Sequence, residues 1–205
     1  MDKKQDYLKG ILVIIVLCLL GLVTWFNVKI TMLEKENYIS ISGKNSDRLN
    51  SLISAKAVEG RYFNDIELQD AVTKKRFLIN YEKPTLILLL SNFGCSPCQK
   101  RELQNFSTIY DEYSKHLNVA AIFDSQDYED ILKLKKVFSL KYPLFITDGA
   151  IVSKYSFSAK YPQMLLIIKN QIVSSFLPLP DDDEFSKWYL SNIIKSIPFL
   201  TASAM

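Results

Sequence analysis

Residues 85–98 have the sequence TLILLLSNFGCSPC, in which an apolar run leads into two cysteines that are separated by two residues. The apolar run predicts a buried strand, and Pro97 suits the first turn of a following helix. The amino end of a helix offers unpaired N–H groups and a positive dipole, which stabilise a thiolate, the nucleophile of disulfide exchange. The pattern predicts that Cys95 attacks a substrate and that Cys98, about one turn further along, resolves the mixed disulfide.

Other uses of such a cysteine pair have less support in the sequence. A closed zinc site normally needs four ligands, and beyond the pair the chain offers only Cys18 and His116 as cysteine or histidine ligands. A purely structural disulfide across so short a loop would remove little entropy from the unfolded chain. We therefore expect no metal and no cofactor, although two thiolates also suit Cu(I) and leave a copper-binding module as an alternative.

Residues 10–28 form a run without a charged side chain. A helix of about 19 residues spans the hydrocarbon core of a bilayer. Trp25 and Phe26 near its end suit the aromatic belt of a membrane interface. Lysines precede the run at positions Lys3, Lys4 and Lys9, and closely after it comes Lys29. The excess of positive charge before the run places the N-terminus in the cytoplasm and the remainder outside.

The alternative to an anchor is a cleaved signal peptide. The residues after the apolar run do not supply a small-residue cleavage site, and Cys18 lacks the small residues that would precede a lipoprotein cysteine. The sequence therefore favours an uncleaved signal anchor in the cell membrane, with one span and a periplasmic or otherwise extracytoplasmic domain. Disulfides persist in that compartment.

The chain of 205 residues carries a formal net charge of only +3, which gives no support for nucleic-acid binding. A stalk is expected where polar residues and Gly43 break the pattern, with helical pieces near residues 32–37 and 47–55. This segment could instead pack on the domain, and the sequence does not decide between the two. The expected organisation is a cytoplasmic N-terminus at residues 1–9, a transmembrane anchor at 10–28, a stalk at 29–56, one globular domain at 57–197, and a tail at 198–205.

Hydrophobic spacing predicts an α/β domain with a central mixed sheet flanked by helices. A β-hairpin formed by residues around 66–68 and 77–79 comes before a central strand at 85–91. The further expected elements are a helix at 97–113, a strand at 119–123, a helix at 129–138, a strand at 143–146, a short helix at 151–157, a hairpin of strands at 164–168 and 172–176, and a last helix after residue 181. The predicted inward side chains include Val137 on the second long helix and Phe185, Trp188, Tyr189 and Ile193 on the last one.

This order of elements resembles the thioredoxin superfamily, and more closely its membrane-anchored TlpA/ResA-like, redoxin (AhpC/TSA-type) branch. The matching stretches are residues 63–68, 83–98 and 160–168, so the resemblance covers roughly residues 60–197. It implies a thioredoxin-like fold with a cis peptide bond at Tyr161-Pro162, facing the cysteines and presenting backbone to a substrate. An ordinary strand-opening proline is the alternative for Pro162. Phe93 and Pro97 are further candidates for the substrate surface, and Phe93 could equally belong to the core.

The chain also departs from the pattern of that family. Gly94 stands where a tryptophan usually precedes the first cysteine, and Leu89 stands where many thioredoxins bury an acid. The acid that TlpA/ResA-like proteins carry three residues after the second cysteine is replaced by Arg101. Glu102 is the candidate proton relay instead, but one residue turns a helix by about 100°, so its side chain could also face water.

The resemblance implies a thiol–disulfide oxidoreductase that reduces disulfides of exported proteins, for instance apocytochromes, and that receives electrons from a membrane thiol donor. The cysteine spacing alone does not fix whether the pair reduces or oxidises. The alternatives are the Cu(I)-binding, metallochaperone-like module, a peroxidase of the peroxiredoxin type, and a non-catalytic adaptor with the same fold. The peroxidase is the least favoured, because Asn92 stands where such enzymes want Thr or Ser.

Overall fold

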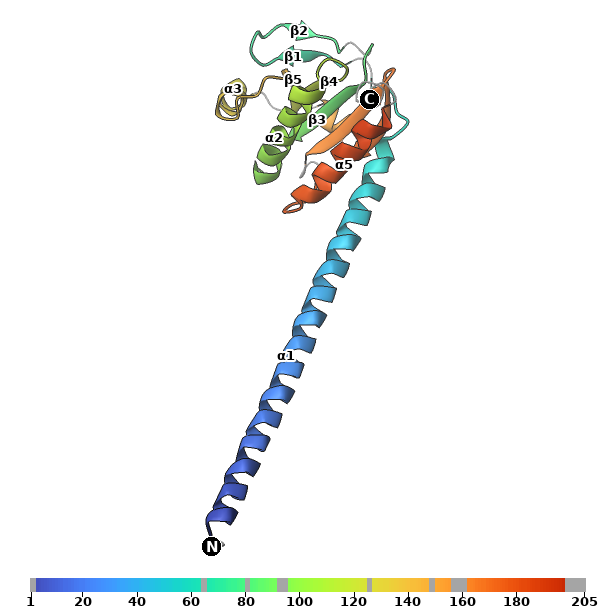
Figure 1. Cartoon of the computed structure of the whole chain (residues 1–205). Helices are drawn as coiled ribbons and strands as arrows, with labels where there is room; N and C mark the ends of the chain where they lie inside the picture. The colour runs from blue at the N-terminus through green and yellow to red at the C-terminus, as the bar shows by residue number, and fades with distance from the viewer. Residues whose placement is uncertain are drawn as a thin grey trace. The chain divides into compact units, whose positions relative to one another are not determined.

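Figure 1 shows the computed structural model of the chain, whose described residues are 3–63, 66–79, 82–91, 96–124, 127–147, 150–155 and 162–197. Side chains are described at these positions except at residues 3–18, 34–42, 96, 150, 152 and 153. The chain divides into two compact units, Met1–Ser46 and Asp47–Met205.

The helix α1 (Lys3–Ala55) makes up the described part of the first unit and continues into the second. The backbone stays helical through residues 40–46, where the sequence predicted a break, so that prediction was wrong. Serine and asparagine lower helix stability by only about 0.5 kcal/mol each and glycine by about 1 kcal/mol, and extending a helix needs no new nucleus. None of the helices that the structure describes has the length and apolar character needed to cross a membrane.

The second unit is built on a mixed sheet. In the part of the chain that the structure describes, the sheet has seven strands in the order β2-β1-β5-β4-β3-β6-β7. Their bounds are β1 Leu68–Asp70, β2 Arg76–Phe77, β3 Thr85–Ser91, β4 Asn118–Asp124, β5 Leu144–Thr147, β6 Gln163–Ile168 and β7 Gln171–Phe176. The neighbours β3, β4 and β5 run parallel, and the other pairs are antiparallel. The predicted hairpin is confirmed as β1 and β2 at one edge.

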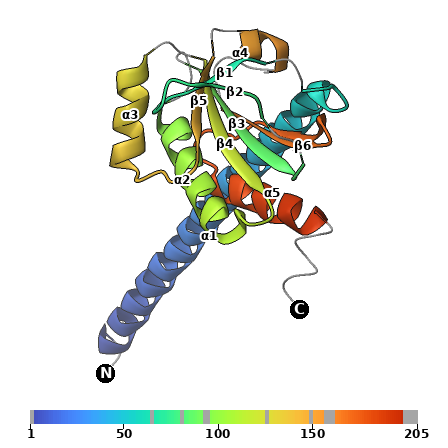
Figure 2. The ribbon, with the colours of Figure 1, turned by 90° about the horizontal axis from the view of Figure 1, so that it is seen from above.

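Helices cover both faces of the sheet (Figure 2). They are the one-turn helix η1 Lys56–Val58, α2 Ser96–Tyr113, α3 Tyr128–Val137, α4 Ala150–Tyr155 and α5 Asp183–Ser196. Buried side chains of α2, α3 and α5 pack on one face, and those of α4 and η1 pack on the other. The layers are therefore helix, sheet and helix, as the alternation of strands and helices predicted.

Strand β3 lies inside the sheet, between β4 and β6, which confirms the prediction for the apolar run. Leu86, Leu88 and Leu90 face the α2 and α5 layer, and Ile87 and Leu89 face the α4 layer. All five are at most 2% exposed. A strand that is covered on both faces needs apolar side chains at every position, which explains the unbroken run in the sequence.

The other predicted elements of the domain are confirmed with small shifts at their ends, but two predicted core side chains are wrong. Val137 is 73% exposed at the end of α3, whose inward contact is made by Ile131. Trp188 is 54% exposed, although Phe185 and Tyr189 beside it are buried. Residues four apart lie almost above one another on a helix, whereas Trp188 lies on the flank of that stripe and stacks on Phe185, with 5.7 Å between ring centroids.

The last turns of α1 belong to the second unit. Ala55 is fully buried, and the Ser51 hydroxyl donates a hydrogen bond to the Leu177 carbonyl. Arg48 forms a bidentate pair with Asp182, at 2.7 and 2.9 Å. Residues 47–55, which the sequence assigned to a stalk, are thus packed against the end of β7 and the start of α5, and the compact unit begins at Asp47 instead of residue 57.

Candidate functional site

Cys98 lies in the first turn of α2, the element that follows β3 in the chain. Its side chain is only 3% exposed, and its sulfur is disulfide-bonded. The neighbouring Pro97 is exposed to solvent. Cys95 and Phe93 lie outside the described residues. Helix α2 begins at Ser96, so the helix start that the sequence predicted beside the cysteine pair is confirmed.

Pro162 lies at the same end of the sheet as the start of α2. Strand β6 runs antiparallel to β3, with Gln163 opposite Leu89, so the residue before β6 lies beside the carboxyl end of β3. Pro162 is buried there. The predicted cis bond also involves Tyr161, which lies outside the described residues. The structure thus brings Pro162 and the cysteine-bearing helix start to one edge of the sheet.

Two glutamines that the sequence analysis did not single out support this edge. Gln99 follows Cys98 and donates a hydrogen bond of 2.6 Å to the carbonyl of Ser91, which ties the first turns of α2 to the end of β3. Gln163 is fully buried and donates to the Ser175 hydroxyl at 2.7 Å. Their positions next to Cys98 and Pro162 were the available signal in the sequence.

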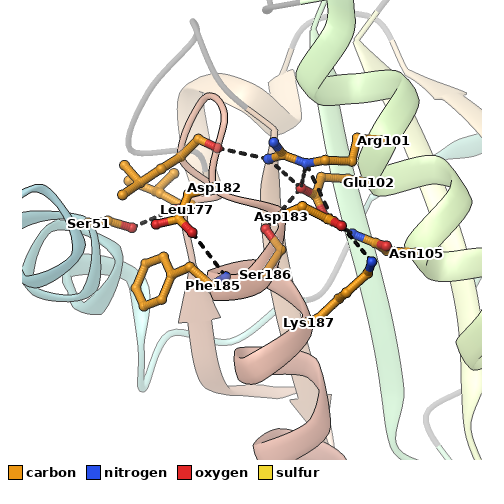
Figure 3. A network of polar contacts seen from close by, with 11 residues as sticks. Ser51, Arg101, Glu102, Asn105, Leu177, Asp182, Asp183, Phe185, Ser186 and Lys187 are labelled. Carbon is orange, nitrogen blue, oxygen red and sulfur yellow. Dashed lines mark hydrogen bonds and ion pairs between the residues drawn. The ribbon is translucent and has the colours of Figure 1, made fainter. Parts of the chain in front are cut away.

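Glu102 is fully buried, so the expectation that it could face water was wrong. Its Oε1 accepts from Arg101 Nε at 2.9 Å and from the Ser186 hydroxyl at 2.9 Å, and its Oε2 accepts from Asn105 Nδ2 at 3.0 Å (Figure 3). The carboxylate therefore joins α2 to α5. These contacts hold the carboxylate between the two helices. The role of Glu102 as a proton relay stays a prediction.

Arg101, Asp183 and Lys187 extend this cluster toward the surface. Arg101 Nη2 donates to the Leu179 carbonyl at 2.8 Å, and its Nε lies 3.9 Å from Asp183 Oδ1. Asp183 also accepts from Asn105 at 3.1 Å and pairs with Lys187 at 2.5 Å. The hydrogen bond from Lys187, together with that from Asn105, holds the pKa of Asp183 below its ordinary value. The sequence pattern indicated only a helix start with acidic residues here.

Within the described ranges, no three side chains of His, Cys, Asp and Glu come together as a metal site would need. Leu89, at the position where an acid was expected from the resemblance, is 2% exposed in the apolar layer under α4.

Comparison with known proteins gave matches in structure only. No family model matches the chain, and no curated protein matches its sequence. A solved thiol:disulfide interchange protein from Bacteroides sp. superimposes with a TM-score of 0.52 at 16% identity, over 68% of this chain and 92% of that one. The thioredoxin domain of a thiol-disulfide oxidoreductase from Bacteroides vulgatus gives 0.51 at 14% identity, over 65% and 96%.

The domain has a thioredoxin-like fold. A peroxidoxin from Mycobacterium tuberculosis gives a similar match, with a TM-score of 0.53 at 16% identity, over 68% of this chain and 97% of that one. At these identities the comparisons support the fold and leave the chemistry to the residues of the site. In this thioredoxin-like domain, Cys98 and Pro162 lie at the end of the sheet where β3 gives way to α2.

Proposed function

We propose that the chain is a thiol–disulfide oxidoreductase in which Cys95 is the nucleophile and Cys98 the resolving cysteine. The observation that carries this proposal is the disulfide-bonded, buried Cys98 in the first turn of α2. We take Cys95, three residues earlier, as the partner of Cys98 in that disulfide. Pro162 at the same edge of the sheet provides a place where a substrate backbone could lie beside the pair.

In the reducing direction, the Cys95 thiolate attacks one sulfur of a substrate disulfide and releases the other as a thiolate. The Cys98 thiolate then attacks Cys95 in the mixed disulfide and releases the second substrate sulfur. Two electrons pass from the enzyme dithiol to the substrate, and a dithiol donor must reduce the enzyme again. The burial of Cys98 suits the second step, because the resolving sulfur is kept from outside disulfides.

We propose the reducing direction, with disulfides of exported proteins such as apocytochromes as substrates and a membrane thiol protein as donor. The resemblance noted from the sequence supports this choice.

We also propose that residues 10–28 anchor the chain in the cell membrane with the domain outside the cytoplasm. Leu19, Leu22, Val23, Trp25 and Phe26 are each more than half exposed on α1. A helix that is apolar all round needs an apolar surrounding. Lys29 lies 5.0 Å from the centroid of the Trp25 ring, an arrangement that suits a membrane interface.

The redox proposal is tested by trapping mixed disulfides on a Cys98→Ser variant in cells. A nucleophilic Cys95 without its resolving partner should accumulate covalent complexes that a reductant releases, and Cys95→Ser should trap far fewer. Cys18→Ser is the matched control, because Cys18 lies in α1, away from the pair in sequence, and should leave trapping unchanged. Cu(I) binding by both cysteines without any exchange with disulfides would contradict the proposal and favour the copper-binding alternative.

The topology is tested separately with reporter fusions after residue 56. An alkaline phosphatase fusion is expected to be active, since that enzyme needs external disulfides, and the protein should resist extraction from membranes by alkaline carbonate. A fusion that is active only with a cytoplasmic reporter would overturn the proposed orientation.

A further inference from the structure

Glu102 places a buried negative charge one helical turn beyond Cys98. Its side chain is 0% exposed, and that of Cys98 is 3% exposed. Residues four apart on a helix share a face, with Cβ atoms about 6 Å apart. A net charge at Glu102 therefore acts on the cysteine sulfur through protein interior, where charges interact more strongly than through water.

Arg101 cancels this charge and is itself held in place. Its Nε and Nη2 lie 2.9 and 2.8 Å from the same oxygen of Glu102, and Nη2 also donates to the Leu179 carbonyl. The other described contacts of the carboxylate, from Asn105 and Ser186, are neutral hydrogen bonds. Figure 3 shows the guanidinium between Glu102 and the chain that leads into α5.

We propose that Arg101 is a positioning residue for the thiol–disulfide reaction, which acts through Glu102 to set the reduction potential of the cysteine pair. The inference rests on the function proposed above. While the Arg101–Glu102 ion pair is intact, the net charge one helical turn beyond Cys98 is close to zero. The other charges described at this cluster, Asp183 and Lys187, pair with each other at 2.5 Å and are partly exposed, so solvent screens them.

The proposal predicts shifts of opposite sign from the two partners. Reduction of the disulfide by glutathione converts one protein disulfide and two glutathione thiols into a protein dithiol and one glutathione disulfide. Arg101→Gln leaves the carboxylate uncompensated, which disfavours a thiolate and lowers the equilibrium constant for reduction. Glu102→Gln removes the carboxylate that binds the guanidinium and leaves Arg101 with only the partly exposed Asp183, 3.9 Å from its Nε, so net positive charge favours the thiolate and raises that constant.

The experiment measures this equilibrium at pH 7 in glutathione buffers, using the full chain in mild detergent and counting free thiols by alkylation. We expect the constant to fall about tenfold in Arg101→Gln and to rise about tenfold in Glu102→Gln, a change of about 30 mV each way for a two-electron couple. The equilibrium constant of the double variant should return close to the wild-type value. Arg101→Lys keeps the positive charge, so its constant should fall less than that of Arg101→Gln. Lys141→Gln, which removes a partner of the exposed Lys141–Asp111 pair, should change nothing.

Structural damage alone would move both single variants in the same direction, and that result, or the absence of any shift, would overturn the proposal. Should Arg101→Gln fail to fold, Glu102→Gln and the double variant still decide, because only electrostatic compensation returns the double variant to the wild-type value. If the wild-type pair forms no disulfide at any glutathione ratio, the proposed function fails instead.

Discussion

At the scale of single residues, the domain depends on a few buried polar side chains that are fully paired. Asp182 is 3% exposed, binds Arg48 through both oxygens, and accepts from the Phe185 N–H at the start of α5. The hydrogen bond to Asp182 raises the pKa of Arg48 further above its ordinary value. One carboxylate thus caps a helix and fixes the end of another.

We expect Asp182→Ala to lower the free energy of unfolding by about 2 kcal/mol, because it leaves α5 without its N-cap and the partly exposed Arg48 without this carboxylate. Urea unfolding of the full chain measures this. The matched control is Asp111→Ala, which removes an exposed partner of Lys141 and should cost less than about 1 kcal/mol. Equal losses of stability in the two variants would contradict the prediction that the buried Asp182 contributes more stability than the exposed Asp111.

Tyr142 gives a prediction that depends on pH. Its hydroxyl is buried and donates to the Leu103 carbonyl at 2.8 Å, and burial raises the pKa of this phenol well above its ordinary value. The neutral phenol therefore contributes stability that is present below the unfolded pKa of about 10 and is lost as pH rises toward the folded pKa.

Tyr142→Phe should lower the free energy of unfolding by about 1 kcal/mol at pH 7, through the lost hydrogen bond. It should also lose less stability than the wild type between pH 9 and about 11, because it has no phenol to ionise on unfolding. Denaturant unfolding at both ends of that range checks this, with the exposed Tyr62→Phe as control. The same alkaline loss in Tyr142→Phe as in the wild type would contradict it.

At the scale of elements, the last helix, α5, shows which buried side chains can be predicted from hydrophobic spacing and which cannot. The stripe Phe185, Tyr189 and Ile193 follows the helical period and is buried, and Tyr189 stacks on Phe176 with 4.2 Å between centroids. Trp188 has the same apolar character but lies on the flank of the stripe, so hydrophobicity alone misplaced it. Which flank is covered depends on neighbouring elements, and these are distant in sequence.

We expect Tyr189→Ala to lower the free energy of unfolding by about 3–5 kcal/mol, as for other buried aromatic side chains. Trp188→Ala should cost less than about 1 kcal/mol, since the indole is more than half exposed. Thermal or urea unfolding of the two variants compares them directly. A larger loss in Trp188→Ala would mean that a covering surface is present in solution.

The candidate site was predicted in part for the same reason. The C-x-x-C pair at a strand-to-helix junction is local in sequence, and so β3, α2 and Cys98 were found. The contacts of Glu102 with Ser186 and of Arg101 with Leu179 join residues 84 and 78 positions apart. The hydrophobic spacing within one helix does not indicate such distant partners. Glu102 was therefore predicted only from its position after Cys98, without its contacts.

At the scale of the molecule, the boundary of the folded domain differs from the one that composition suggested. Polar residues made 29–56 resemble a stalk, yet Ala55 and Ser51 are buried within the second unit. Short polar side chains can either pack on a domain or stay exposed to solvent, and the sequence does not distinguish the two cases.

We expect a shortened chain that begins at Asp47 to unfold at the same temperature as the full domain, and one that begins at residue 57 to unfold at a lower temperature or to aggregate. The shorter piece lacks Arg48, Ser51 and Ala55, and so loses an ion pair, a hydrogen bond and apolar packing. Thermal unfolding of both pieces measures the difference. Equal stabilities would show that residues 47–56 are dispensable.

The contacts at the end of α1 also constrain when the domain can form. Arg48 and Ser51 bind residues 134 and 126 positions further along the chain. Because ribosomes add residues from the N-terminus, this helix end is made early and waits for partners that are made last. Strand β3 waits likewise for β6. The chain therefore stays open until its C-terminal part has been made, and an open chain is what the export proposed above requires, because a translocation channel admits a chain only before it closes.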